Sequence, residues 1–180
     1  MSSKSPFPRH RRPYEERPTH NTAVPGRYFV TLATVNRNNL FISRAAVDAL
    51  ANSWVGLKQH YKGLAMGSFV VMPNHVHGIL TIQPGGARHA RGADQAAATA
   101  AAKVKGRAIA KIGLPQILGV FKAETARAVN TMRTTLDEPV WSEIIEDHVI
   151  TDNRELKALE QYIAMNPEKW EIDELFVAAV

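Results

Sequence analysis

Two histidines near the middle of the chain have a spacing that suggests chemistry. His75 and His77 flank Val76 within an apolar stretch, Ala65–Ile82, that is interrupted by Pro73-Asn74. In a β-strand, side chains at positions i and i+2 project from the same face, so both imidazoles would point together. Two such imidazoles can hold one divalent cation. The alternative interpretation is a pair of surface histidines beside a turn.

Two imidazoles make an incomplete metal site, and a helix near the chain's end offers two further groups. Tyr162 and Asn166 are four residues apart, which places both side chains on one helical face. The Asn166 carbonyl oxygen could bind a hard cation, and Tyr162 could supply a phenolic oxygen. The alternatives are a tyrosine at the boundary of the core and an asparagine that ends a helix before Pro167.

The elements that must position these residues can be predicted from periodicity. Alternation and β-branched content predict strands, and helical spacing together with capping residues predicts helices. The strands are expected at Arg27–Val35, Gly67–Met72, His75–Ile82 and within Val140–Ile150, and the helices after Ser43, from Pro115 to Met132 and from Asn153 to Asn166. This order predicts an α+β fold with a ferredoxin-like βαββαβ plan. We expect an antiparallel sheet with helices on one face, plus a C-terminal helix that bears Tyr162.

Composition divides the chain into an arm and one domain. Residues 1–26 are rich in proline and arginine and have no apolar periodicity, so we expect a disordered basic N-terminal arm. Residues 27–180 are expected to form a single catalytic domain. Within it, residues 83–105 are rich in glycine and alanine, which predicts a flexible surface insertion.

The overall composition excludes several classes of protein. Of the 180 residues, 45% are hydrophobic and none is cysteine, so a packed core is expected while disulfides and thiol catalysis are excluded. No apolar run approaches the roughly 18 residues that cross a bilayer. The Ser/Pro/Arg-rich first 20 residues do not resemble a secretory signal. We therefore expect a cytoplasmic protein with no membrane association.

Charge is distributed unevenly along the chain. From Asp137 onward there are 12 acidic and three basic residues, whereas the first 136 residues hold 19 basic and five acidic ones. A basic front part of this kind would attract a polyanion such as nucleic acid. The candidates for contacts with the phosphates of such a polyanion are Lys103, Lys105, Arg107, Lys122 and Arg127.

Several blocks of the sequence resemble one family of DNA-processing enzymes. The string from Val71 to His77 resembles the HUH signature (His, hydrophobic, His) of single-tyrosine transposases, and it is particularly similar to that of the REP-associated tyrosine transposases. Other blocks agree and follow in the family's order. They are the opening strand with its turn, RYFVTLATVNRNNLF; GVFK at 119–122 with Thr125 and Asn130; Trp141 with DHVI at 147–150; and YIAMNPEKW at 162–170.

The resemblance covers about four-fifths of the chain and implies a function. His75 and His77 would bind Mg²⁺ or Mn²⁺, with Asn166 completing the protein ligands. Tyr162 would attack a phosphate of single-stranded DNA that carries palindromic, hairpin-forming repeats, and would leave a 5′-phosphotyrosine and a free 3′-OH. The implied enzyme is a transposase that nicks DNA and transfers strands. His148 is one candidate for accepting the phenol proton.

Two other functions remain open at this stage. The same fold could serve as a nucleic-acid-binding module without catalysis, or it could be a His-dependent metal phosphodiesterase in which water attacks. The protein could be a monomer or a homodimer, because the tyrosine helix could serve the histidines of its own chain or those of a second copy.

Overall fold

The computed structural model describes residues 25–84, 88–89, 112–135, 137–173 and 175–177. The strands of its main sheet are β1 (Gly26–Ala33), β3 (Leu64–Met72), β4 (His75–Ile82) and β6 (Glu146–Ile150). The α-helices are α1 (Arg44–His60), α2 (Leu114–Met132) and α3 (Asn153–Met165). Two 3-10 helices, η2 (Val35–Arg37) and η3 (Pro167–Ile172), and a short pair of strands, β2 (Tyr61–Lys62) and β5 (Arg88–His89), complete the described elements.

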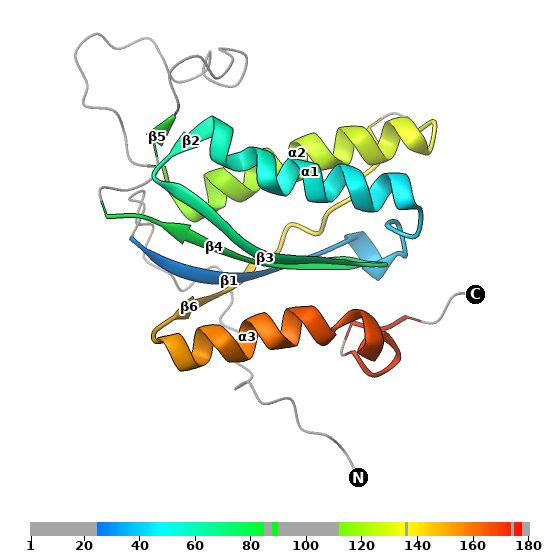
Figure 1. Cartoon of the computed structure of the whole chain (residues 1–180). Coiled ribbons are helices and arrows are strands. Elements are labelled where there is room, and N and C mark those ends of the chain that lie inside the picture. Colours follow the sequence, from blue (N-terminus) through cyan, green and yellow to red (C-terminus); the bar gives the residue numbers. More distant parts are fainter. Residues whose placement is uncertain (1–24, 85–87, 90–111, 136, 174, 178–180) are drawn as a thin grey trace, which may run out of the picture.

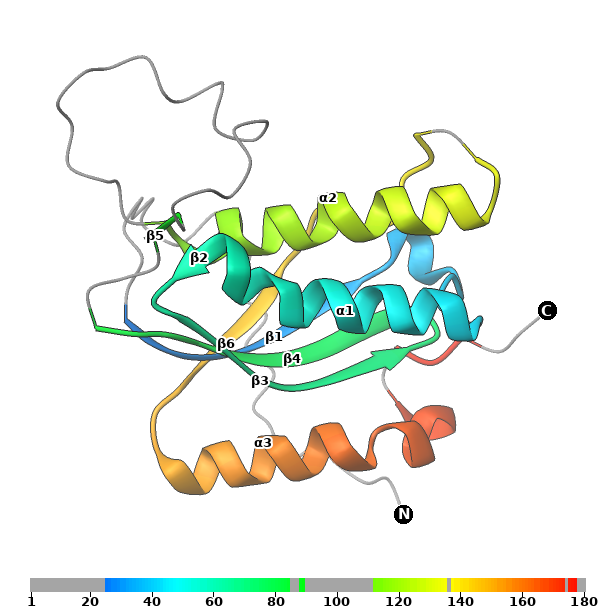
Figure 2. The same cartoon turned by 45° about the horizontal axis from the view of Figure 1, so that its top comes forward.

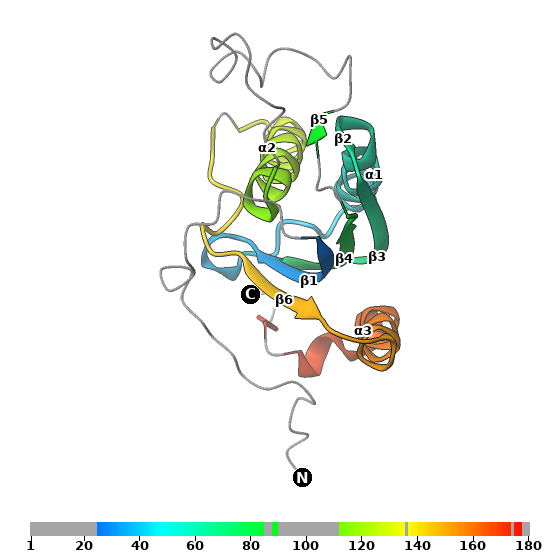
Figure 3. The same ribbon diagram turned by 90° about the vertical axis from the view of Figure 1, so that its left-hand side faces the viewer.

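The main sheet is antiparallel, with the strand order β3-β4-β1-β6. Helices α1 and α2 lie side by side over one face of this sheet, and α3 lies across the other face (Figure 1 and Figure 2). The view along the strands in Figure 3 separates the three layers. The predicted ferredoxin-like α+β fold is confirmed, with the tyrosine-bearing helix on the face opposite to α1 and α2.

Helix α1 begins where the sequence predicts and packs closely on the sheet. The Ser43 hydroxyl oxygen accepts a hydrogen bond from the Ala46 N–H, which caps the helix. Trp54 is fully buried and stacks on Phe69, with 4.7 Å between ring centroids. A Cβ at Gly78 of β4 would lie 2.5 Å from the Trp54 ring, so the absence of a side chain lets α1 approach the sheet.

Helix α3 is held to the sheet by a separate apolar cluster. Asp152 caps its first turn by accepting from the N–H groups of Arg154 and Glu155. Leu159 and Ile163 are buried against Ile79 and Ile150 on the face of the sheet that α1 and α2 do not cover. The helix stops before Pro167, because proline cannot donate the backbone hydrogen bond that would continue it. This packing determines where Tyr162 lies.

The first predicted strand ends earlier than expected, and the last one lies within its predicted range. β1 ends at Ala33, because Asn36 and Arg37 adopt left-handed backbone angles (φ 54° and 55°) that turn the chain away from the sheet. The strand predicted within Val140–Ile150 is confirmed as β6, Glu146–Ile150, and the segment before it forms an isolated bridge between Trp141 and Thr34.

The two predicted flexible segments fall mostly outside the described residues. This is true of residues 1–24 of the predicted arm, while Gly26 already belongs to β1. Within the predicted insertion, Arg88–His89 pair with Tyr61–Lys62 as β5 and β2. Within the described ranges, no helix has both the length and the apolar character needed to cross a membrane.

Candidate functional site

The two histidines of β4 lie together on the face of the sheet that α3 covers. In the antiparallel register, His77 pairs with Thr31 of β1 and Val70 of β3, and His75 pairs with Ala33 and Met72. The imidazole Nε2 atoms are 3.1 Å apart, with ring centroids at 4.6 Å. The exposed fractions are 0% for His75 and 5% for His77, so the pair is shielded from solvent. The predicted same-face placement is confirmed.

The outer nitrogen of each imidazole has a polar partner. His75 Nδ1 is 2.8 Å from Asn74 Oδ1, and His77 Nδ1 is 2.9 Å from the Thr31 hydroxyl oxygen. Partners of this kind orient the rings and select the tautomer of each imidazole. Both Nε2 atoms are therefore directed toward the same small volume.

Both imidazoles are kept neutral by their surroundings. Burial lowers the pKa of His75 from 6.5 to about 4, and the positive charge of Arg37 adds to this effect. Burial also lowers the pKa of His77 well below its usual value, and the neighbouring His75 contributes in the same direction. A neutral imidazole has a free nitrogen lone pair, which is the form that binds metal ions.

Tyr162 reaches the histidines of its own chain. Its hydroxyl oxygen lies 3.4 Å from His77 Nε2, and the two ring centroids are 5.3 Å apart. Phe29 of β1 stacks on His77 at 5.3 Å and meets the Tyr162 ring edge-on at 6.1 Å. The phenol and the imidazoles thus come together within one chain, with Phe29 forming one wall of the site.

Asp173 is a third group at the site that the sequence analysis missed. Its Oδ1 atom lies 4.0 Å from His75 Nε2, and its side chain is only 5% exposed. One ligand atom from each of His75, His77 and Asp173 lies within 4.8 Å of the others, so this group could hold a metal ion. Asp173 is one of twelve acidic residues in the last part of the chain, and no spacing relative to the histidines distinguishes it.

Burial also affects the Asp173 carboxyl. It raises the pKa of Asp173, and the hydrogen bond from the Leu175 N–H and the nearby Asn166 amide offset this effect only in part. A carboxyl withdrawn from water in this way is stabilised by a positive charge beside it, which a cation between Asp173 and the two imidazoles would provide.

Asn166 lies one helical turn beyond Tyr162, as predicted, and is buried with 3% of its surface exposed. Its Nδ2 atom is close enough to Asp173 to lower the pKa of that carboxyl, but it makes no hydrogen bond to any described residue. A buried amide with an unsatisfied end is costly unless a further group enters the site. The unsatisfied Nδ2 group is a donor, so this observation fits a hydrogen-bond acceptor, such as an anionic oxygen, beside Asn166.

The C-terminal segment covers the histidine pair. Trp170 lies with its ring centroid 5.9 Å from that of His75, and Phe176 packs edge-on against Trp170 at 5.1 Å. The Leu175 carbonyl accepts a hydrogen bond of 2.7 Å from Asn74 Nδ2. These contacts place Asp173 against β4 and close the site on that side.

Of the five residues predicted to contact phosphates, the structure describes two, Lys122 and Arg127. Lys103, Lys105 and Arg107 lie outside the described residues. Lys122 is half-buried and donates a 2.7 Å hydrogen bond to the Ser142 carbonyl, and burial lowers its pKa. In this structure the Lys122 ammonium group therefore joins α2 to the segment before β6, and a phosphate contact stays a prediction.

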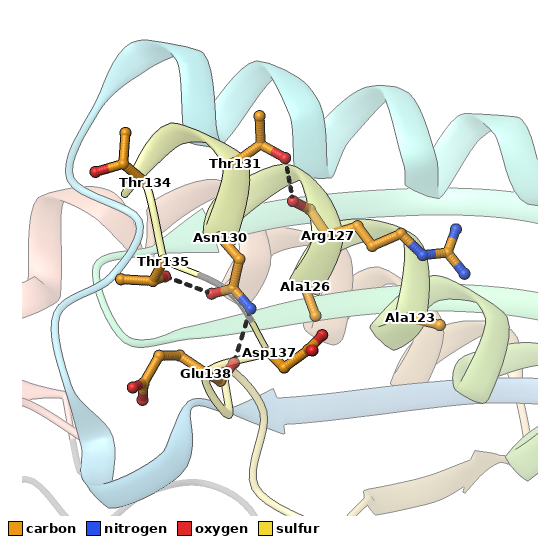
Figure 4. Close-up of a pocket in the computed structure, with 9 residues that line it drawn as sticks. All are labelled: Ala123, Ala126, Arg127, Asn130, Thr131, Thr134, Thr135, Asp137 and Glu138. Carbon is orange, nitrogen blue, oxygen red and sulfur yellow. Dashed lines mark hydrogen bonds between the residues drawn. The ribbon is translucent and has the colours of Figure 1, made fainter.

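Arg127 lies at a groove on the far side of the sheet from the histidines. This groove, of about 620 Å³, is formed by the last turns of α2 and the loop that follows (Figure 4). Its polar groups largely bond to one another: Asn130 donates to the Glu138 carbonyl and accepts from Thr135, and Thr131 donates to the Arg127 carbonyl. The groove contains none of the residues predicted to bind metal or to act as the nucleophile.

His148 contacts the first turn of α3. Its Nε2 atom is 2.5 Å from Glu155 Oε1 in the first turn of α3, seven residues before Tyr162. Seven helical residues span about 10 Å along the axis. The structure therefore pairs His148 with Glu155, and His77 is the imidazole next to the phenol.

Comparisons with known proteins give distant likenesses. No protein-family model matches the chain. An uncharacterized protein of Haemophilus influenzae is 24% identical over 168 residues, which cover 88% of this chain and 89% of that protein.

Among solved structures, the fold is similar to that of a REP-associated tyrosine transposase bound to a REP hairpin, with a TM-score of 0.49, 18% identity and coverage of 82% of this chain and 70% of that one. It is also similar to a protein of Deinococcus radiodurans described as a candidate transposase, with a TM-score of 0.47, 17% identity and coverage of 82% and 95%.

Proposed function

We propose that this protein is a transposase that nicks single-stranded DNA and transfers the strand, with Tyr162 as the nucleophile and a divalent metal ion at His75 and His77. Its substrate would be DNA whose palindromic repeats fold into hairpins. The observation that carries the proposal is the meeting of a phenol, two neutral imidazoles and a buried carboxylate from three separate parts of the chain. The sequence blocks shared with REP-associated tyrosine transposases support the same function.

The covalent step suits the position of Tyr162. The phenol would give its proton to a solvent water, its oxygen would bond to phosphorus, and the bond from phosphorus to the 3′ oxygen would break. The leaving 3′ oxygen would take a proton from water, so the products are a 5′-phosphotyrosine and a 3′-OH. Because the phosphodiester energy is retained in the new bond, a 3′-OH can reverse the step and join strands. Phe29 and the packing of α3 hold the phenol next to His77, which reduces the entropy lost on reaching the reactive geometry.

The residues around the histidines fit a divalent cation. His75, His77 and Asp173 would supply two nitrogens and one oxygen. The side-chain oxygen of Asn166 would complete the protein ligands, as the family resemblance implies. When bound, a cation such as Mn²⁺ or Mg²⁺ draws charge from the phosphate oxygens and fixes their orientation. Two imidazole ligands favour Mn²⁺ over Mg²⁺, because Mg²⁺ prefers oxygen ligands.

A denaturing gel with labelled DNA tests the proposal. The probe is a single-stranded DNA whose palindromic repeat folds into a hairpin, labelled at its 3′ end and incubated with the protein and Mn²⁺. We expect a covalent protein–DNA adduct that is lost in Tyr162→Phe. Tyr61→Phe should keep the adduct, because Tyr61 is buried in the core beneath α1 and α2.

The other outcomes separate the alternatives. Binding without cleavage by the unaltered protein would contradict catalysis and indicate a binding module. Cleavage that survives Tyr162→Phe would indicate attack by water. His75→Ala should abolish cleavage while leaving most DNA binding intact, because phosphate contacts are spread over many cations.

A further inference from the structure

The side chain of Asn74 connects three segments that meet at the histidine pair. Asn74 is fully buried in the turn between β3 and β4. Its Nδ2 group donates to the Arg37 carbonyl at 3.2 Å and to the Leu175 carbonyl at 2.7 Å, and its Oδ1 atom lies 2.8 Å from His75 Nδ1. The backbone is held as well, since Thr34 donates to the Asn74 carbonyl from both its N–H and its hydroxyl.

These contacts determine which end of the amide is oxygen. Carbonyl oxygens only accept hydrogen bonds, so the end of Asn74 that faces the Arg37 and Leu175 carbonyls must be the NH₂ group. The opposite end, which faces His75, must then be the oxygen. That oxygen cannot donate, and His75 Nδ1 must therefore carry the proton of this bond.

The position of this proton determines what His75 offers to the site. A neutral imidazole carries one proton, and on His75 that proton is at Nδ1. Its Nε2 atom then presents a lone pair toward His77 Nε2, 3.1 Å away, and toward Asp173 Oδ1, 4.0 Å away. The other tautomer would place a hydrogen atom in the same volume and exclude a cation.

We propose that Asn74 is a positioning residue that prepares two metal ligands at once: it selects the Nδ1–H tautomer of His75, and it holds the Leu175 carbonyl so that Asp173 faces His75. This inference rests on the proposed function for the role of the cation. It adds a residue that does not itself touch metal or DNA, and it explains how the turn before the histidines is coupled to the end of the chain.

The tautomer of His77 follows from the same contacts. With a lone pair on His75 Nε2, the 3.1 Å contact between the two imidazoles requires His77 to donate from its own Nε2. The Thr31 hydroxyl then donates to His77 Nδ1. In the metal-free protein the two histidines therefore carry their protons on different nitrogens, and His77 must move its proton to Nδ1 before its Nε2 can bind a cation.

Nitrogen NMR of metal-free protein labelled with ¹⁵N-histidine tests this directly. At pH 7.5 we expect His75 to show a protonated, pyrrole-type Nδ1 and an unprotonated, pyridine-type Nε2, with the reverse pattern for His77. Substitution of each histidine in turn assigns the signals. A His75 ring protonated at Nε2 in the unaltered protein would overturn the proposal, and this measurement needs neither metal nor DNA.

Variants then connect the tautomer with metal affinity. Asn74→Leu should produce a mixture of His75 tautomers and weaken Mn²⁺ binding, measured by calorimetry, about 10–100-fold. Asn74→Asp retains the acceptor for His75 but has no N–H for Leu175, so it should keep the tautomer and still bind Mn²⁺ more weakly. The control is Asn39→Ala, which removes the bond to the Val177 carbonyl but leaves Asn74 intact and should change affinity less than about threefold.

These results separate the inference from the proposed function. Unchanged tautomers and Mn²⁺ affinity in Asn74→Leu would contradict the role of Asn74, whatever the protein does to DNA. If Asn74→Leu does not fold, the tautomer of the unaltered protein and the behaviour of Asn74→Asp still decide the question. If the protein forms no DNA adduct but shows the expected tautomers, the transposase proposal is overturned. Asn74 would still be a positioning residue for His75 in that case.

Discussion

At the scale of single residues, the site depends on side chains that burial keeps uncharged. His75 and His77 lose their contact with water beneath α3 and the C-terminal segment, and both pKa values fall as a result. The same burial raises the pKa of Asp173. An imidazole pair that stays neutral below pH 7 can still bind a cation. Because the same imidazoles take up protons more readily in the unfolded chain, acid stabilises the unfolded state relative to the folded one.

We therefore predict that acid destabilises the protein before its carboxylates are protonated. Between pH 6.5 and about 4, His75 binds a proton in the unfolded chain but not in the folded one, so stability falls as the pH falls. The shift of the His75 pKa from 6.5 to about 4 corresponds to about 3 kcal/mol. The raised pKa of Asp173 acts in the opposite direction, because the folded protein then binds that proton more readily. Urea unfolding across this pH range measures the effect.

The matched variant for this prediction is His75→Gln, which cannot take up a proton. Its stability should depend less steeply on pH between 6.5 and 4 than that of the unaltered protein. Parallel curves for the two proteins would show that His75 does not titrate as its burial implies.

At the scale of elements, one face of the sheet carries most of the hydrophobic core and the other carries the candidate site. The face under α1 and α2 carries the large core, in which Trp54, Phe69 and Phe121 are in mutual ring contact. The other face carries the histidines and a smaller apolar cluster that holds α3. β4 belongs to both, because successive residues alternate between the two faces. The position of α1 over Gly78 therefore supports the strand that carries the site.

We predict that Gly78→Ala destabilises the protein by about 1–3 kcal/mol, because the new methyl group would overlap the buried Trp54 ring. Gly56→Ala in α1 is the control, because its Cβ would meet no heavy atom within 4 Å. Replacing a glycine inside a helix by alanine should raise the free energy of unfolding by about 0.5–1 kcal/mol. Chemical unfolding of both variants measures these changes. A Gly78→Ala protein as stable as the unaltered one would contradict the close approach of α1.

At the scale of the whole molecule, the site joins parts of the chain that are far apart in sequence. His75 and Asp173 are separated by 98 positions, and their ligand atoms come close only when η3 and the residues after it lie over β4. A cation at this site would bind the folded chain and not the unfolded one. Any such ligand stabilises the folded state by mass action.

Mn²⁺ should therefore raise the melting temperature of the protein. At a concentration 100 times the dissociation constant, the stabilisation amounts to about 2.7 kcal/mol. Asp173→Asn should lose most of this effect, whereas Asp137→Asn, in the exposed loop after α2, should retain it. Scanning calorimetry with and without Mn²⁺ provides the measurement, and equal shifts in the two variants would place the ion elsewhere.

The sequence by itself determined the elements and much of the site, because both depend on short-range periodicity. The i, i+2 spacing put His75 and His77 on one face of a strand, and the capping residues and apolar spacing of α3 indicated the helix that carries Tyr162. The placement of α3 next to the histidines of its own chain required the tertiary structure, since no local pattern distinguishes docking to one chain from docking to another.

The positions of Asp173 and Asn74 at the site follow from long-range contacts in the folded protein and not from any local sequence pattern. Asp173 reaches the site because Trp170 packs against His75 and the Leu175 carbonyl bonds to Asn74, contacts between residues about a hundred positions apart. The predicted contact of Lys122 with a DNA phosphate stays a prediction, and only the tertiary structure places its ammonium group against the Ser142 carbonyl. Residue type and spacing specify what a side chain can do, whereas long-range packing decides which partner it meets.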